Sequence, residues 1–160
     1  MSKYASETEV SVDRSEAEIK RTLLRYGADD IVTGHSTRQG AAFVRFFYRD
    51  LHIRISMPLP SPEEDRFTKT DKGRRRTATQ ARREYEKATR QQWRVLLLLL
   101  KAKLEAVENE LLPEREMFMP WILLPSGRTV FEEADPGLSR WIETGEQPKM
   151  LPFSSEGGQA

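Results

Sequence analysis

One long segment of the chain has an apolar residue at every third or fourth position: Trp93, Leu97, Leu100, Leu104, Val107 and Leu111. Because a helical turn takes 3.6 residues, this spacing predicts a single helix over residues 77–112, ended by Pro113. Neither Gly nor Pro interrupts that range. Leu96, Leu98 and Leu99 widen the apolar stripe, so we expect the middle of the helix to be buried on most of its sides.

Shorter segments with strand character precede this helix, over residues 30–36, 41–48 and 51–57. A two-residue turn at Arg49-Asp50 would pair Tyr48 with Leu51, and this register also pairs Phe46 with Ile53 and Val44 with Ile55. Arg49-Asp50 is not a favoured type I′ pair, so the turn only weakly specifies the register. The opposite face of this hairpin would carry Phe43, Arg45, Phe47, His52, Arg54 and Ser56.

The remaining patterns predict a strand over 7–12, then a helix that starts at Asp13 or Ser15 and ends before Gly27. A further strand is predicted over 117–124 and a short helix over 129–144, broken or kinked at Pro136-Gly137. The order βαβββ, long helix, strand, short helix predicts an α+β fold, with a mainly antiparallel sheet and helices packed on it. We expect one domain over 1–152, an exposed loop over 61–76 and a disordered tail over 153–160.

Composition excludes several classes of chemistry. The 160 residues include no cysteine, which rules out disulfides, thiolate metal ligands and a cysteine nucleophile. The longest apolar run, from Val95 to Leu100, is far too short to span a membrane, and the first residues lack the apolar core of a signal peptide. We therefore expect a cytoplasmic protein that does not bind membranes.

Basic residues gather between Arg66 and Lys103, where thirteen basic and three acidic residues give a local charge of +10. The rest of the chain has thirteen basic and twenty-two acidic residues, a charge of −9, so the net charge of +1 hides a strong asymmetry. Clustered cations suit a phosphate backbone, because each neutralised phosphate releases counterions. We expect phosphate contacts from the loop and helix start: Lys72, Arg74, Arg75, Arg76, Arg82, Arg83, Lys87 and Arg90. The alternative is a solvated helix face partly balanced by Glu84 and Glu86.

The outer face of the predicted hairpin is a second candidate site. Phe43 and Phe47 alternate with arginines, and such a face can stack unpaired bases while Arg45 and Arg54 bind phosphates. The alternative is that the long leucine-rich helix covers this face, which would then form a second core layer.

No catalytic, metal or cofactor motif is present. The only histidines, His35 and His52, lack metal-ligand spacing, and there is neither a phosphate-binding glycine loop nor a nucleophile elbow. We predict no catalytic residue, metal or cofactor. A nuclease built on His52 with Arg45 and Asp50 remains an alternative.

Three stretches carry a family resemblance: residues 11–29 (SVDRSEAEIKRTLLRYGAD), 57–60 (MPLP) and 93–108 (WRVLLLLLKAKLEAVE). They resemble a small uncharacterised protein family of bacteriophages and prophages, over about Tyr4 to Pro152. The resemblance implies a bacterial host cell as the location and nucleic acid or host machinery as the partner, but no assigned activity.

These observations together predict a non-enzymatic, phage-type accessory protein that binds DNA or RNA through its basic loop and helix start. The alternative is a protein-binding adaptor, or an inhibitor of a host or defence complex, that docks through the same charged helix. The apolar surplus of the long helix could be buried in a homodimer or hetero-complex. Alternatively, this helix is sandwiched within one chain, between the sheet and the C-terminal helix that contains Trp141.

Overall fold

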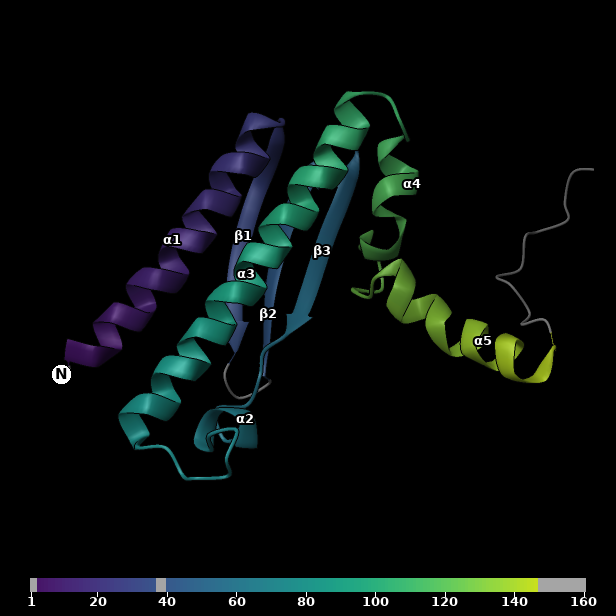
Figure 1. Cartoon of the computed structure of the whole chain (residues 1–160). Coiled ribbons are helices and arrows are strands. Elements are labelled where there is room, and N and C mark those ends of the chain that lie inside the picture. Colours follow the sequence, from purple (N-terminus) through teal and green to yellow (C-terminus); the bar gives the residue numbers. More distant parts are fainter. Residues whose placement is uncertain (1–2, 37–39, 147–160) are drawn as a thin grey trace, which may run out of the picture.

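The computed structural model describes residues 3–36 and 40–146, with side chains from residue 14 onward. Its elements are α1 (Lys3–Arg25), β1 (Ala28–Ser36), β2 (Ala41–Tyr48), β3 (Leu51–Pro58), α2 (Asp65–Thr68), α3 (Ala78–Glu108), α4 (Glu114–Phe118), the 3-10 helix η1 (Met119–Trp121) and α5 (Val130–Thr144) (Figure 1). The three strands form one antiparallel sheet in the order β1-β2-β3. This confirms the predicted α+β fold. The tail predicted over 153–160 lies outside the described residues.

The register predicted for the hairpin is confirmed, because Tyr48 pairs with Leu51, Phe46 with Ile53 and Val44 with Ile55. The turn between β2 and β3 has an unfavoured residue, Arg49, at a φ of 54°. Contacts to α4 hold it: Arg49 binds Glu114 at 3.1 Å and Asp50 binds Arg115 at 2.9 Å. Tertiary contacts therefore support a turn that its own residues do not favour.

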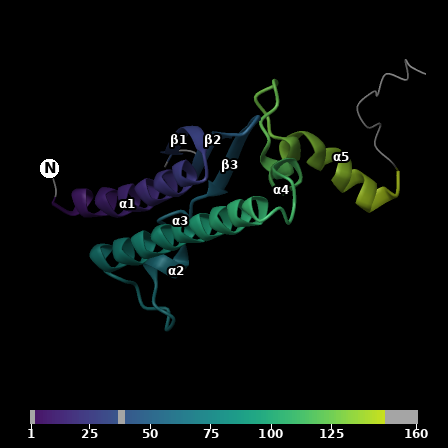
Figure 2. The same ribbon diagram turned by 90° about the horizontal axis from the view of Figure 1, so that it is seen from above.

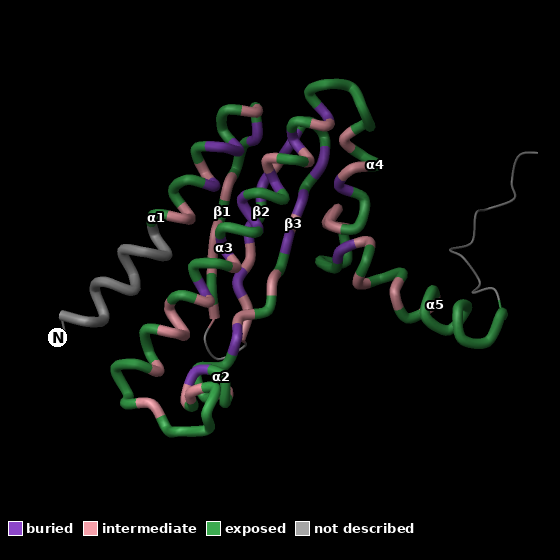
Figure 3. Tube along the Cα trace, in the orientation of Figure 1, coloured by how far each residue is buried: buried purple, intermediate pink, exposed green. Residues whose placement is uncertain are grey.

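Helices α1 and α3 lie side by side on one face of the sheet (Figure 2). The core fills the space between these layers and contains Ile19 and Leu23 of α1, Val44, Phe46, Tyr48, Ile53 and Ile55 of the sheet, and Trp93, Leu97, Leu100 and Leu104 of α3 (Figure 3). The opposite face of the sheet is covered by neither helix. The fold is thus a two-layer structure with one open sheet face.

The predicted strand over 7–12 is wrong, because these residues belong to α1. Six alternating residues are a weak strand signal, and no Gly or Pro separates them from the amphipathic segment that follows. Once the later segment is helical, each preceding residue extends the helix at little cost. The helix start predicted at Asp13 or Ser15 is wrong for the same reason.

The predicted strand over 117–124 is also largely wrong, since the chain forms α4 and η1 there. Phe118 is buried with its ring edge-on to Phe46 and Tyr48, at centroid distances of 6.0 and 5.9 Å. Strand pairing in this segment is limited to two isolated antiparallel bridges, between Ile122 and Ile53 of β3 and between Leu123 and Thr129. The apolar pattern therefore indicated a segment that anchors to the core through Phe118, but it gave the wrong secondary structure.

The long predicted helix is present as α3, and its start has a physical cause. Thr77 accepts a hydrogen bond from the Gln80 amide while the Gln80 side chain accepts one from Thr77, which forms a capping box. Burial on most sides is not found. Leu100 is fully buried, whereas Val95 and Leu98 on the outer side are 58% and 57% exposed.

Helix α5 begins at the edge of β3 and extends away from the other elements (Figure 1). A capping box between Thr129 and Glu132 starts it, and Gly145 ends it in a left-handed conformation. Trp141 is 40% exposed, so the expectation that α5 and the sheet sandwich α3 within one chain is wrong. Among the residues that the structure describes, no helix has the length and apolar character needed to cross a membrane.

Candidate nucleic-acid interface

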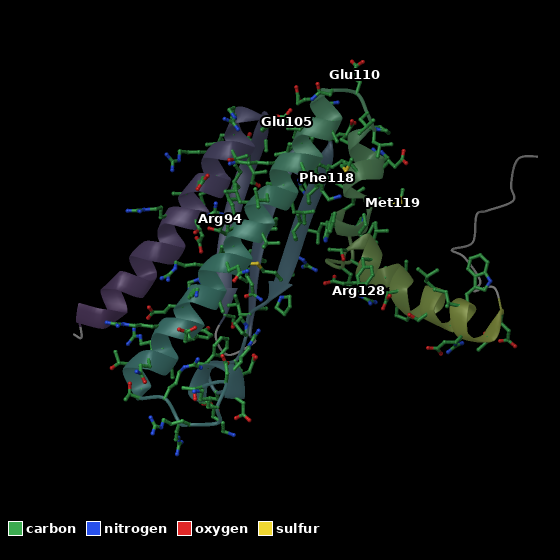
Figure 4. The ribbon with its side chains drawn as sticks, viewed as in Figure 1. Arg94, Glu105, Glu110, Phe118, Met119 and Arg128 are labelled. Carbon is green, nitrogen blue, oxygen red and sulfur yellow. The ribbon has the colours of Figure 1, made fainter. Side chains whose placement is uncertain are left out.

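Four cations of α3 form a continuous row along one flank of the helix: Arg83, Lys87, Arg90 and Arg94. Their spacing of four, three and four residues places them above one another, over about 16 Å of helix. Lys87, Arg90 and Arg94 line an open groove between α3 and α1, and Arg94 is labelled there in Figure 4. We call these four residues the α3 cationic row.

None of these four side chains forms an ion pair with a carboxylate among the side chains that the structure describes. Their neighbours differ in this respect. Arg82 binds Glu86 one turn away at 2.9 Å, and Lys101 binds Glu18 of α1 at 3.4 Å. The cationic row therefore keeps its positive charge available, whereas Arg82, a predicted phosphate ligand, is partly neutralised.

The basic loop before α3 is more ordered than predicted. The helical turn α2 buries Phe67 edge-on against Tyr85 of α3, with ring centroids 5.7 Å apart, and Lys69 and Arg75 form an isolated strand bridge. The guanidinium of Arg76 donates hydrogen bonds to the carbonyls of Arg66, Phe67 and Lys69. Arg76 thus holds the loop together rather than facing solvent as a free cation.

Three other cations of this loop are exposed at the N-terminal end of α3: Lys72, Arg74 and Arg75. No ion pair to them exists within the described residues. Two acidic residues of the loop bind other cations, since Glu64 binds Arg66 at 2.6 Å and Asp65 binds Lys69 at 2.9 Å. The loop tip and the cationic row together form one basic region at the start of α3.

The second predicted surface, the sheet face with Phe43, Arg45, Phe47, His52 and Arg54, is open. The alternative that the long helix covers it is wrong, because α3 packs on the opposite face. Phe43 lies over Gly34, where an added Cβ would come within 2.5 Å of the ring, and Phe47 contacts His52 edge-on at 4.9 Å. The two aromatic rings are therefore partly engaged with the sheet itself.

The arginines of this face differ in availability. Arg54 binds the Glu132 carboxylate of α5 at 2.7 Å and the Gly127 carbonyl at 3.1 Å. Hydrogen bonding from Thr129 at the helix start, followed by the charge of Arg54, holds the pKa of Glu132 below its usual range. Arg45 is exposed without a carboxylate partner among the described residues. Only one of the two predicted phosphate ligands here remains free.

The sheet face and the basic region of α3 lie on opposite sides of the molecule (Figure 2). The two predicted candidate sites are therefore separate surfaces and cannot contact one short stretch of nucleic acid together. Among the side chains that the structure describes, the basic region has seven cations without a carboxylate partner, namely the cationic row with Lys72, Arg74 and Arg75, whereas the sheet face has Arg45.

The histidines are not arranged for catalysis in the described part of the chain. His52 lies on the open face beside Phe47, whereas the carboxylate of Asp50 is bound to Arg115. His35 lies 3.9 Å from Glu16 of α1. No group of three potential metal ligands occurs among the described residues.

Sequence reasoning identified an apolar surplus on the long helix but did not place it beside the basic residues. Directly beside the cationic row, on the outer side of α3, Val95 and Leu98 are exposed. Their spacing continues from Ala88 and Gln91 to Ala102 in steps of three and four, which is the signal that could have identified a second apolar stripe. The basic region therefore borders an apolar surface.

Comparisons of the chain with protein-family models, with curated proteins and with solved structures give no match.

Proposed function

We propose that this chain is a non-enzymatic nucleic-acid-binding protein that contacts the phosphate backbone of DNA or RNA through the basic region of α3. The observation that carries the proposal is the α3 cationic row, in which four aligned cations lack a carboxylate partner among the described side chains. Unpaired cations in a row attract a polyanion and release its counterions on binding.

The chemistry of the region favours backbone contacts over base recognition. Its members are arginines and lysines. The two aromatic residues between Arg83 and Arg94 are engaged elsewhere, since Tyr85 packs against Phe67 and Trp93 is buried in the core. Phosphate contacts position a protein on nucleic acid but carry no sequence information. We therefore expect binding with little sequence specificity. The resemblance to phage proteins supports the same proposal, because genes of mobile elements act mainly on nucleic acids or host machinery.

The test replaces Arg83, Lys87, Arg90 and Arg94 together by Gln and measures binding to labelled single- and double-stranded oligonucleotides by fluorescence anisotropy. Each lost phosphate contact should reduce the slope of log affinity against log salt by about 0.9 on duplex DNA, so four lost contacts predict a reduction of about 3.6. Circular dichroism should show an unchanged fold, since the four side chains are exposed.

A matched control removes the same charge outside both predicted surfaces, by changing Arg21, Arg25, Arg115 and Arg140 to Gln. These side chains are also exposed, and only a small change in the salt slope is expected. The proposal is wrong if the unmodified chain binds neither DNA nor RNA at low salt. An equal reduction of the salt slope in both variants would also contradict the proposal, because binding would then depend on the net charge of the chain and not on the cationic row.

A second candidate function is protein binding, and the apolar stripe beside the cationic row is the observation that favours it. Mixed apolar and basic surfaces are typical of protein interfaces, where fully exposed leucines are buried on association. An adaptor or inhibitor of a host complex would recover a stoichiometric acidic protein when the tagged chain is purified after nuclease treatment. Recovery of nucleic acid alone without that treatment would favour the first function.

A further inference from the structure

The outer side of α3 exposes an apolar stripe that faces away from the sheet. It consists of Ala88, Val95, Leu98, Leu99 and Ala102, together with Gln91. Val95 and Leu98 are more than half exposed, and the steps of three and four residues resemble the seam by which one helix packs on another. We call this surface the α3 outer stripe.

Helix α5 exposes a second apolar surface on one side: Phe131, Leu138, Trp141 and Ile142. Ile142 is 76% and Phe131 55% exposed. Their spacing places them on one face of the helix, and α5 is exposed along nearly its whole length (Figure 3). An isolated helix of fifteen residues is marginal in water unless its apolar face is packed.

The two surfaces cannot meet within one chain, because the start of α5 is fixed at the edge of β3. The Val130 amide donates to the Ile122 carbonyl at 3.0 Å, and Glu132 binds Arg54 on the open sheet face at 2.7 Å. The α3 outer stripe lies beyond the other face of the sheet (Figure 2). One chain therefore has two apolar helix faces and no means of joining them.

The charges beside the two apolar faces are complementary. Three acidic residues of the α5 segment have no ion pair among the described residues: Asp135, Glu143 and Glu146. The α3 outer stripe is bordered by the cationic row, whose four members are likewise unpaired. Opposite unpaired charges next to apolar faces favour association and suppress other pairings.

We propose that α5 of one copy of this chain packs on the α3 outer stripe of a second copy, and that the exchange is reciprocal in a two-fold dimer. Each copy then supplies one acidic helix and one basic, apolar helix face, as closed two-fold symmetry requires. The dimer buries Leu98 and Trp141 in both interfaces. Its apolar contacts do not involve phosphate, but the acidic residues of α5 would lie beside the same cationic row that is proposed to bind phosphate, so dimer formation and nucleic-acid binding would compete for these cations.

The test uses the full chain with single charged substitutions in each surface, Leu98→Glu on α3 and Ile142→Glu on α5, and measures mass by light scattering after size-exclusion chromatography. The unmodified chain should have twice the monomer mass, and each variant alone should be monomeric. Leu24→Glu, at an exposed leucine of α1 outside both surfaces, is the matched control and should remain dimeric. Circular dichroism checks that all three variants stay folded.

Mixing the two variants provides the decisive measurement. In a mixed pair, α5 of the Leu98→Glu copy meets α3 of the Ile142→Glu copy, and both of these surfaces are intact, so one of the two interfaces is restored. Dimers should therefore reappear only in the mixture. A monomeric unmodified chain, a dimer that survives Ile142→Glu, or a mixture without dimers would each overturn the proposal. If the Ile142→Glu variant remained dimeric while the Leu98→Glu variant became monomeric, the result would indicate direct pairing of α3 with α3 instead.

Discussion

Five consecutive leucines of α3, Leu96 to Leu100, divide between two opposite environments. Leu96, Leu97 and Leu100 face the sheet and α1 and belong to the core, while Leu98 and Leu99 face outward on the side of Val95. All five side chains are chemically identical, and they differ in their position around the helix. What differs is the layer of structure opposite each side chain.

This comparison extends to the charged residues of α3. Lys103 is half-buried near α4, where its Nζ donates to the Met117 carbonyl at 3.0 Å and lies 4.6 Å from the centre of the Trp121 ring. Burial lowers the pKa of Lys103. Arg94, two and a half turns earlier, is exposed and has no such partners. Residues of one type on one helix therefore divide into those that stabilise the fold and those that remain available for binding.

The largest expected effect is on the inner side. Leu100→Ala should lower the free energy of unfolding by about 2–5 kcal/mol, because it removes a fully buried side chain and leaves a cavity between α3 and the sheet. Chemical denaturation measures this change, and Leu99→Ala is the control on the outer side. If both substitutions lowered the free energy of unfolding by a similar amount, the inner and outer sides of α3 would contribute equally to stability, and the comparison would be wrong.

A smaller effect on the free energy of unfolding is expected for the two basic residues compared above, Lys103 and Arg94. Lys103→Ala should cost about 1–2 kcal/mol, since it removes a hydrogen bond and a cation–π contact in a partly buried site. Arg94→Ala should change the free energy of unfolding by less than about 0.5 kcal/mol. Thermal denaturation of both variants tests the distinction. If Arg94→Ala were the more destabilising variant, Arg94 would be a structural residue and not part of a binding surface.

The smallest effect is expected for the outer stripe at low protein concentration. Leu98→Gln should change the unfolding free energy of the dilute chain by less than about 0.5 kcal/mol, because Leu98 is exposed in the single chain. At high concentration, the unmodified chain should gain stability from association, whereas the variant should not. Unfolding curves at several concentrations measure this. A concentration-independent difference between the two proteins would mean that Leu98 contributes within one chain.

Much of the fold was predictable because local rules and tertiary packing agreed. The hairpin register follows from alternation around Arg49-Asp50, and the starts of α3 and α5 lie at the capping residues Thr77 and Thr129, whereas α3 ends at Glu108, four residues before the predicted end. Prediction failed over 7–12 and 117–124, where short apolar patterns are compatible with either helix or strand. In both ranges the surroundings determined the secondary structure: the helix of α1 propagated through 7–12, and burial of Phe118 fixed α4.

The candidate site was predictable in composition but not in arrangement. The excess of basic residues before and within α3 is visible in the sequence, as is the alignment of Arg83 with Lys87. The sequence does not show that the loop carbonyls bind Arg76 or that Glu132 binds Arg54, because these partners come from backbone geometry and from a distant segment. The pairing of Arg82 with Glu86 follows from their helical spacing. Together these contacts remove three of the predicted phosphate ligands from the freely available set.

The sequence by itself determined the α+β class, the register of the hairpin and the concentration of positive charge near the start of α3, because each depends on spacing between neighbouring residues. Only the tertiary structure decided which face of the sheet is open, which leucines of α3 are buried and where α5 points. Those outcomes depend on which layers come into contact, and contact between distant segments depends on the packing of the whole chain.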